Sequence, residues 1–365
     1  MNLTQFQGKK VLITGHTGFK GCWLTAWLLR LGATVAGFSD RIPTSPAHFD
    51  AANMGGRLSH HIGDIRNLAL VVQLIKDEQP DFVFHLAAQA LVRRSYLDPY
   101  LTIETNVMGT ANILEALRLS QHPCTAIVVT SDKSYDNVEQ VWGYRENDAL
   151  GGKDPYSASK GAAELVVKTY ANSYFSALDS PVKVAVGRAG NVIGGGDWAE
   201  DRIVPDCVRA WSQGGAVDIR YPRATRPWQH VLEPLSGYLL LALSLAKDPN
   251  LNGEPFNFGP PAQQNYTVAE LLDEIKKHWP GAGWKDVSGS SSFHEAGLLK
   301  LCCDKALHKI GWQPVMNFAG TVRLTSSWYR SFYESSDIDV WNLTQCQIAE
   351  YESLAGDRCA VWAAP

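Results

Sequence analysis

Cysteine is scarce and unpaired in this sequence, and its arrangement excludes two structural classes. The 365 residues contain seven cysteines, an odd number, with no CxxC pair and with Cys302 and Cys303 adjacent. Neither a disulfide framework nor a zinc site uses such a pattern. The histidines, including His60 and His61, also lack metal-ligand spacing. We therefore expect reduced thiols, a cytoplasmic location and no metal.

Long apolar runs and clusters of basic residues are absent as well. The longest apolar stretch, residues 235–246, has about a dozen residues, which is too short to cross a bilayer and predicts a buried helix. The formal net charge is -4 without a basic run, so neither nucleic acid nor a membrane is an expected partner. The first residues contain no apolar signal core, so we expect no export.

Short strand patterns alternate with helical patterns through the first half of the chain. This alternation predicts an α/β fold with a doubly wound parallel sheet and helices on both faces. The predicted strands are residues 11–13, 34–38, 81–85, 126–130 and 182–186, and the predicted helices are residues 23–31, 66–78, 106–119 and 156–175.

The composition changes after Gly187, where glycine, proline, arginine and tryptophan become dense. We therefore predict a dinucleotide-binding domain over residues 1–187, with residues 228–258 returning to it. A smaller substrate-binding domain is expected from residues 188–227 and 259–365. Its predicted helices are residues 268–278, 305–310 and 319–333, whereas the polar tail after Glu334 suggests only a short helix.

A glycine-rich turn lies between the first strand and the first helix. Residues 14–21 read TGHTGFKG, with glycines at 15, 18 and 21. Gly15 permits the tight turn, Gly18 lets backbone N–H groups approach a pyrophosphate, and Gly21 lets helix and strand pack closely. Three spaced glycines are weak evidence alone, but this position after the first strand predicts a dinucleotide site.

Two carboxylates follow later strands. Asp40 comes 19 residues after Gly21, where a carboxylate can bind the ribose hydroxyls of NAD. Arg41 is adjacent and is able to meet a 2′-phosphate, which leaves NADP as an alternative. Asp64, at the end of the third strand, is either an adenine-side contact or a helix cap.

Tyr156 and Lys160 lie one helical turn apart, on one face of a predicted helix. A nearby ammonium lowers the pKa of a tyrosine, so that the phenolate accepts a hydroxyl proton as hydride leaves the same carbon. Chance predicts roughly 0.6 such pairs in a chain of this composition. Of the 13 tyrosines, Tyr156 alone has a lysine at this spacing.

These motifs together resemble the extended short-chain dehydrogenase/reductase family, whose members modify nucleotide sugars. Further matching motifs are LAAQ at residues 86–89, Asn106, and GRAGNV at residues 187–192. The resemblance covers essentially the whole chain and implies a Rossmann-type domain, tightly held NAD, and a substrate between two domains. It also suggests a homodimer or tetramer, with a dimer formed through helices 103–119 and 156–175. The implied cofactor contacts are Gly15, His16, Gly18, Phe19, Lys20, Gly21, Asp40, Asp64, Ile65, Ala87, Ala88, Gln89, Asn106, Tyr156 and Lys160.

An acidic and a basic residue follow the fifth strand and narrow the chemistry that the resemblance implies. Ser131 matches the position that hydrogen-bonds the reacting sugar hydroxyl, and 4,6-dehydratases add an acidic pair directly after it. Here Asp132 fills the first acidic position, but Lys133 stands where most dehydratases have glutamate. The strings at residues 131–137, 142–147, 190–198 and 226–234 are similar to the branch that acts on CDP-glucose. Without the resemblance, Asp132 and Lys133 would equally be an exposed ion pair.

The implied reaction is dehydration of CDP-glucose to its 4-keto-6-deoxy product, for dideoxyhexose and O-antigen synthesis. Tyr156 takes the C4 hydroxyl proton, protonated Asp132 gives a proton to the leaving C6 hydroxyl, and neutral Lys133 takes the C5 proton. The alternatives are a nucleotide-sugar 4-epimerase and a non-catalytic NAD-binding sensor.

The expected substrate contacts lie mainly in the second part of the chain. Arg220 and Arg226 flank a proline-containing stretch, and a guanidinium suits a nucleotide diphosphate, although a surface salt bridge is the alternative for each. The full set of expected substrate contacts is Arg94, Asn191, Arg202, Pro205, Arg220, Arg226 and His230.

Overall fold

A seven-stranded parallel sheet forms the centre of the computed structural model, which describes residues 2–177, 180–288, 298–335 and 337–363. The strand order is β11-β6-β5-β4-β1-β2-β3, so the chain reverses its direction of winding between β1 and β4. This is the predicted doubly wound α/β fold. The strands are β1 (Lys10–Thr14), β2 (Thr34–Ser39), β3 (Ser59–Ile62), β4 (Phe82–His85), β5 (Cys124–Val129), β6 (Val182–Ala189) and β11 (Pro255–Phe258).

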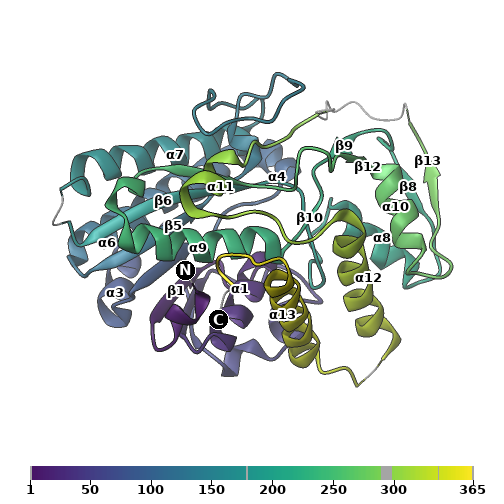
Figure 1. Cartoon of the computed structure of the whole chain (residues 1–365), viewed down its shortest axis with the longest axis horizontal. Coiled ribbons are helices and arrows are strands. Elements are labelled where there is room, and N and C mark those ends of the chain that lie inside the picture. Colours follow the sequence, from purple (N-terminus) through teal and green to yellow (C-terminus); the bar gives the residue numbers. More distant parts are fainter. Residues whose placement is uncertain (1, 178–179, 289–297, 336, 364–365) are drawn as a thin grey trace.

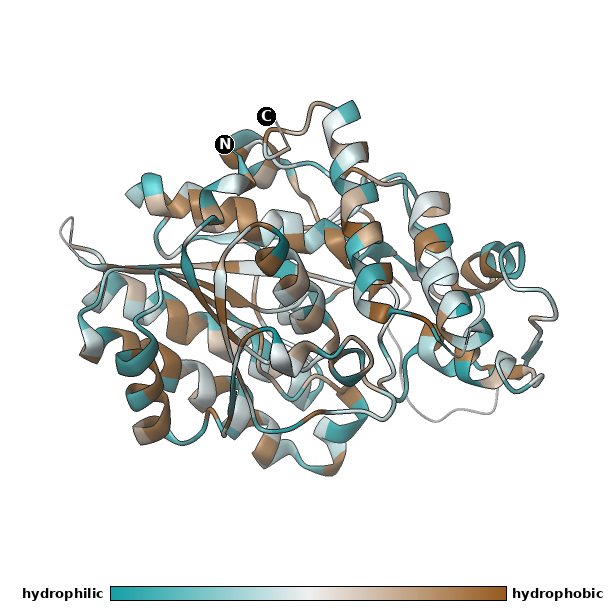
Figure 2. Ribbon diagram, turned by 90° about the horizontal axis from the view of Figure 1, so that it is seen from below, coloured by the Kyte–Doolittle hydropathy of each residue, from teal (hydrophilic) through white to brown (hydrophobic). Residues whose placement is uncertain are grey.

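Alternate side chains of each strand enter two different hydrophobic cores, one on each face of the sheet. Leu12 and Val83 pack with helices α3 (Leu68–Glu78), α6 (Gly109–Ser120) and α7 (Pro155–Tyr174). Val11 and Phe84 pack on the opposite face, with α1 (Phe19–Arg30) and α9 (Leu232–Lys247). Figure 2 shows the hydrophobic strands as a central layer with helices on both sides. Two-sided burial explains why these strands are almost continuously apolar.

Helix α9 contains the apolar stretch for which we predicted a buried helix, and that prediction is confirmed. Its residues from Leu232 to Leu245 are buried against the sheet. Among the residues that the structure describes, no helix is long and apolar enough to cross a membrane.

A smaller group of elements lies beside the sheet, on the right of Figure 1. Helix α10 begins at a capping box, in which the Thr267 and Glu270 side chains each bond the other's backbone N–H. The elements of this group are β7 (Val192–Ile193), α8 (Ile203–Trp211), β8 (Val217–Ile219), β9 (Thr225–Arg226), β10 (Gln229–His230), β12 (Tyr266–Thr267), α10 (Val268–Lys276), β13 (Trp284–Asp286) and α12 (Phe318–Glu334). The remaining elements are η1 (Leu3–Phe6), α2 (His48–Ala51), η2 (Met54–Gly56), α4 (Val92–Leu97), α5 (Pro99–Ile103), η3 (Glu104–Met108), η4 (Asp132–Ser134), η5 (Pro249–Leu251), α11 (Asp304–Ile310) and α13 (Val340–Asp357).

Helix α13 shows that the expectation of a short helix after Glu334 was wrong. It has 18 residues and packs on α1, where Trp27 Nε1 donates to Glu352 at 2.8 Å. The predicted division into two domains stays a prediction. However, two helices within residues 259–365 contact the predicted dinucleotide-binding domain: α11 contacts strand β11, and α13 contacts helix α1.

A buried carboxylate, Glu233, joins the start of α9 to the C-terminal part of the chain. It accepts backbone N–H bonds from Val315 at 3.0 Å and Met316 at 2.5 Å, and the Tyr351 hydroxyl at 2.8 Å. Tyr351 also bonds Ser236 at 3.2 Å. We call Glu233, Ser236, Val315, Met316 and Tyr351 the Glu233 cluster.

Candidate active site

The glycine turn has the geometry that a dinucleotide cradle needs. Gly15 has a φ of +77°, and a Cβ there would lie 2.7 Å from the Ala87 nitrogen, so the turns after β1 and β4 meet at this point. A Cβ on Gly21 would lie 2.1 Å from the Gly15 carbonyl oxygen. Gly18 caps α1 without a side-chain hydrogen bond. The helix N-terminus therefore keeps N–H groups available for phosphate.

The side chains of the turn divide between the protein interior and the site. His16 is fully buried and bonds Ser39 and His60 at 2.9 and 2.7 Å, so it faces away from the phosphate cradle. Burial lowers the pKa of His16 to about 4, with a further contribution from His60. Phe19 lies against Gly194. Of the predicted side-chain contacts in this turn, Lys20 is the one directed toward the charged residues of the site.

The two carboxylates that follow β2 and β3 are accessible. Asp40 and Arg41 form a half-exposed ion pair at 3.7 Å. Asp64 bonds Arg66 at 2.6 Å, and hydrogen bonding to Arg66 is the main cause of its lowered pKa. Asn67, not Asp64, caps α3, so the alternative of a helix cap at Asp64 is wrong. Ile65 is buried against Gly109.

Asn106 connects the loop after β4 to helix α7. Its side chain accepts the Gln89 N–H at 2.8 Å and donates to the Gln89 carbonyl at 3.1 Å and to Ser159 at 2.8 Å. It lies in a π-helical turn, where a single-turn bulge redirects a side chain. Ala88 lies in the same loop, and the Ala87 N–H donates to Thr14 at 3.2 Å. The predicted contacts Ala87, Gln89 and Asn106 thus line one edge of the sheet.

Ser131 and Asp132 are buried directly after β5. Ser131 Oγ donates to Asp132 Oδ1 at 2.9 Å, and Asp132 Oδ2 is buried without a hydrogen-bond partner in the part of the chain that the structure describes. A Cβ on Gly190 would lie 1.8 Å from that oxygen, so the end of β6 leaves room for the carboxylate only because residue 190 is glycine. The Lys133 side chain is half-buried and makes no hydrogen bond among the described residues. The alternative of an exposed Asp132–Lys133 ion pair is excluded by this burial.

Tyr156 and Lys160 lie on α7 beside this segment, but their interaction differs from the prediction. Burial raises the pKa of Tyr156, opposed mainly by a hydrogen bond with Ser131 and by the Arg202 charge. Lys160 Nζ instead points to the Val129 carbonyl at 3.4 Å. Burial lowers the pKa of Lys160 to about 8, opposed by Glu164. The predicted lowering of the Tyr156 pKa by Lys160 is therefore wrong for the protein alone.

Five charged side chains converge on the site from separate parts of the chain. Lys20 interacts electrostatically with Arg202, Asp132, Lys160 and Asp197, and burial and Arg202 lower its pKa to about 7. Arg202 also forms an ion pair with Asp197 at 3.0 Å. Three cations thus face two carboxylates, which favours an anionic ligand such as a diphosphate. The sequence had suggested Lys20 and Arg202, but not Asp197.

The other predicted substrate contacts fall in different surroundings. Arg94 and Arg220 are exposed, Arg226 is half-buried in β9, and Pro205 is buried in α8. Asn191 follows Gly190 at a φ of 32°. His230 is fully buried against Trp23 at 5.7 Å between ring centroids, and burial lowers its pKa to about 3. We therefore assign His230 to the core rather than to substrate.

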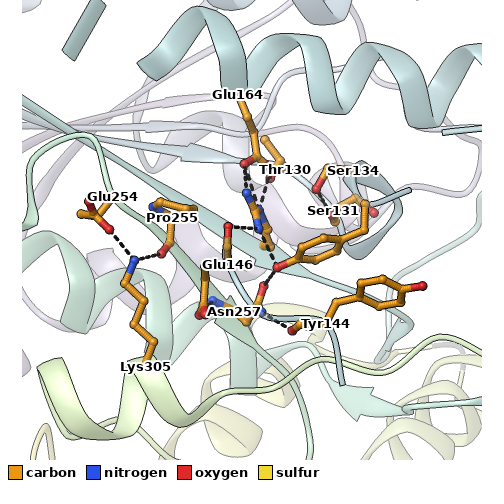
Figure 3. A network of polar contacts seen from close by, with 12 residues as sticks. Thr130, Ser131, Ser134, Tyr144, Glu146, Glu164, Glu254, Pro255, Asn257 and Lys305 are labelled. Carbon is orange, nitrogen blue, oxygen red and sulfur yellow. Dashed lines mark hydrogen bonds and ion pairs between the residues drawn. The ribbon is translucent and has the colours of Figure 1, made fainter. Parts of the chain in front are cut away.

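Sequence reasoning missed a buried polar network next to the segment after β5, drawn in Figure 3. Its centre is the ion pair between Glu164 and Arg188. Arg188 bonds the Tyr135 hydroxyl, which in turn bonds Asn257. The one available signal was Glu164 four residues after Lys160, on the same helix face.

Comparisons with known proteins agree with this arrangement. Residues 12–251 match the family described as GDP-mannose 4,6-dehydratase. The chain is 43% identical to the CDP-glucose 4,6-dehydratase of Salmonella typhimurium over 95% of this chain and 97% of that protein. It is 26% identical to a dTDP-glucose 4,6-dehydratase of Xanthomonas campestris over 87% and 92%. Among solved structures, the dTDP-glucose 4,6-dehydratase of Streptomyces venezuelae superposes with a TM-score of 0.75 at 24% identity, covering 88% of this chain and 96% of that one, which supports the fold.

Proposed function

Because the chain belongs to the nucleotide-sugar 4,6-dehydratases of the extended short-chain dehydrogenase/reductase family, we propose that it converts CDP-glucose to CDP-4-keto-6-deoxyglucose with NAD. The observation that carries the proposal is the position of Asp132. Its carboxylate is buried, bonds Ser131 and interacts electrostatically with Tyr156, and its Oδ2 has no hydrogen-bond partner among the described residues, which supports a role as the acid that elimination requires. The 43% identity over nearly the whole chain supports CDP-glucose as the substrate.

The glycine turn and the strand ends around it fit NAD. The Gly15 and Gly21 contacts leave no space for a side chain, and the uncapped N-terminus of α1 is suited to the pyrophosphate. The exposed Asp40 carboxylate is placed for the ribose hydroxyls, which favours NAD over NADP. When bound, NAD supplies a positively charged hydride acceptor that takes hydride from C4 and returns it to C6.

Oxidation at C4 uses the buried hydroxyl groups. Tyr156 removes the C4 hydroxyl proton, and Ser131, bonded to Tyr156, holds the same hydroxyl. Arg202, whose charge lowers the Tyr156 pKa, stabilises the phenolate. The resulting 4-ketone acidifies the proton on C5.

Elimination uses the segment after β5. Protonated Asp132 donates to the C6 hydroxyl, the C6–O bond breaks, and water leaves. Lys133, whose amine makes no bond within the described protein, takes the C5 proton and returns it to C5 as hydride reaches C6. Lys133 is thereby restored, and the proton that Tyr156 took from the C4 hydroxyl passes to Asp132, so that all three groups are regenerated in each turnover.

A panel of nucleotide sugars tests the proposal. CDP-, dTDP-, UDP- and GDP-glucose and GDP-mannose are incubated with the enzyme without added reductant, and products are identified by NMR. We expect a 4-keto-6-deoxy sugar from CDP-glucose at the highest kcat/KM. A C4 epimer would instead assign a 4-epimerase, and NAD binding without turnover of any sugar would assign a sensor.

A homodimer through the helices of residues 103–119 and 156–175 is the oligomeric state that we propose. Large apolar side chains are exposed on these helices: Ile103 is 47% exposed, Met108 53% and Leu165 56%. Sedimentation that finds only a monomer at working concentration would contradict this. We also propose a cytoplasmic location, which the seven unpaired cysteines support.

A further inference from the structure

A buried ion pair lies directly beneath the segment that carries Asp132 and Lys133 (Figure 3). Glu164 follows Lys160 by one turn of α7, and Arg188 lies near the end of β6. Their side chains are only 3% and 2% exposed, and Arg188 Nε is 2.9 Å from both carboxylate oxygens of Glu164. Burying two charges costs desolvation energy that their attraction rarely exceeds, so stability alone does not account for the pair.

Two further hydrogen bonds of the pair reach the two ends of residues 130–135, which we call the catalytic segment, and a third runs from Arg188 Nη1 to the Glu146 carbonyl at 3.2 Å. Thr130 Oγ1 donates to Glu164 at 2.6 Å, and Arg188 Nη1 donates to the Tyr135 hydroxyl at 2.5 Å. The Arg188 guanidinium also lies over the Tyr135 ring, 4.6 Å from its centroid. Tyr135 then donates to Asn257 at 2.8 Å.

Hydrogen bonds within the catalytic segment also hold its middle residues together. Ser134 donates to the Ser131 carbonyl through its hydroxyl at 2.7 Å and its backbone N–H at 3.1 Å. With its ends fixed and its middle bonded internally, the segment holds Asp132 in a buried position, where Oδ2 has no hydrogen-bond partner among the described residues. This single 3₁₀ turn packs on α7, and the anchors at its two ends add to that contact in setting its geometry.

We propose that Glu164 and Arg188, through Thr130 and Tyr135, are positioning residues that align Asp132 and Lys133 for water elimination. The inference rests on the proposed function and deepens it. Tyr156 is held by a 20-residue helix, so oxidation at C4 depends less on these anchors than elimination does. Loosening the anchors therefore slows elimination selectively, which distinguishes alignment from a purely structural role.

Two variants that each delete one hydroxyl test this. Thr130→Val and Tyr135→Phe keep the side-chain volume and remove the bond at one end of the catalytic segment. We expect each to lower kcat about tenfold with little change in KM. In a single turnover with CDP-glucose, bound NADH and a 4-keto-glucose intermediate should accumulate. Tyr351→Phe is the matched control, because it removes an equally buried tyrosine hydroxyl in the Glu233 cluster and should leave this partitioning unchanged.

A double variant tests the ion pair itself. Glu164→Leu/Arg188→Met replaces both charges with apolar side chains, a change that buried pairs often tolerate. It should remain folded by circular dichroism and show the same accumulation of NADH. Elimination at the wild-type rate in a folded double variant, or in both single variants, would overturn the proposal. An equal decline of oxidation and elimination would also overturn it.

The panel of nucleotide sugars that tests the proposed function also separates that function from the positioning role inferred here. If wild-type protein forms no 4-keto-6-deoxy product from CDP-glucose, both are overturned. If wild-type protein forms the product and the variants partition as wild type does, the function stands and the positioning role fails.

Discussion

The active site and the Glu233 cluster both contain buried ionisable side chains close to the same sheet, but these side chains differ in how many hydrogen-bond partners they have. In the Glu233 cluster, a single carboxylate accepts two backbone N–H groups and a hydroxyl. In the active site, Asp132 Oδ2 has no hydrogen-bond partner within the described residues, and the Lys160 amine lies 3.4 Å from the Val129 carbonyl. Buried polar groups are normally bonded, so the unsatisfied set is the one that a ligand completes.

The difference separates groups that stabilise the fold from groups that act on a ligand. Deleting an atom of the active site should cost activity and little stability. Deleting an atom of the Glu233 cluster should do the reverse. The variants below test both halves of this contrast.

The largest effect on turnover is expected from Tyr156→Phe. The proton acceptor is lost while the ring still fills its buried position, so kcat should fall about 10³-fold. Copurified NAD and the thermal midpoint should change little. NADH formation after rapid mixing with CDP-glucose gives the measurement, and a near-normal amplitude and rate would refute the role of Tyr156.

Lys133→Met should block elimination while leaving oxidation intact. Methionine is similar in length, so packing is retained while the basic nitrogen is lost. Overall kcat should fall about 10²-fold, with bound NADH accumulating and exchange of the C5 hydrogen in deuterated water slowed. Wild-type exchange at C5 would show that Lys133 is a bystander, and a raised KM with normal partitioning would show that it only holds substrate.

Gly18→Val should weaken cofactor binding about tenfold to a hundredfold, because a branched side chain at the start of α1 occupies the pyrophosphate space. A Cβ at Gly18 meets only the Gly15 carbonyl oxygen, at 3.3 Å, so accepting it requires that backbone to shift by a few tenths of an ångström. The measurement is the NAD content of the purified variant and its recovery of activity on addition of NAD. An NAD content equal to that of the wild-type protein would contradict the assignment of this turn as the cofactor-binding cradle.

The smallest effect on turnover is expected from Glu233→Gln, which should instead alter the pH dependence of stability. Burial raises the pKa of Glu233 from 4.5 to about 7. The folded protein then holds a proton that the unfolded chain releases, so the wild-type free energy of unfolding should fall as pH rises from 4.5 to 7. The decline should reach at most about 3 kcal/mol. The free energy of unfolding, measured with urea across this pH range, should vary less with pH in the variant than in the wild type. Identical pH profiles would show that Glu233 does not cause the decline.

Much of the fold and the cofactor turn could be predicted because their signals are local. Alternating strand and helix patterns specify the parallel sheet, and three glycines in eight residues specify the cradle. The Tyr156–Lys160 spacing correctly placed both residues on one face of α7. It did not reveal that Lys160 points to the Val129 carbonyl, because spacing gives a face and not a side-chain direction.

The residues that were missed or misassigned depend on contacts distant in sequence. Glu164 and Arg188 are 24 residues apart and meet across α7 and β6. His16 and His230 lie in motifs that match the family, but both rings are buried by partners elsewhere. The length of α13 was missed because half of its residues are polar, although its apolar side chains contact α1.

The packing of α13 on α1 has a consequence for synthesis of the chain on the ribosome. Trp27 belongs to the strand–helix unit that carries the glycine turn, whereas Tyr351 and Trp362, which cover it, lie more than 300 residues later. The Leu3 N–H likewise waits for the Trp362 carbonyl. The nascent cofactor half therefore lacks the cover over Trp27 until these later residues have been synthesised, and chaperones that bind apolar segments have that interval in which to engage it.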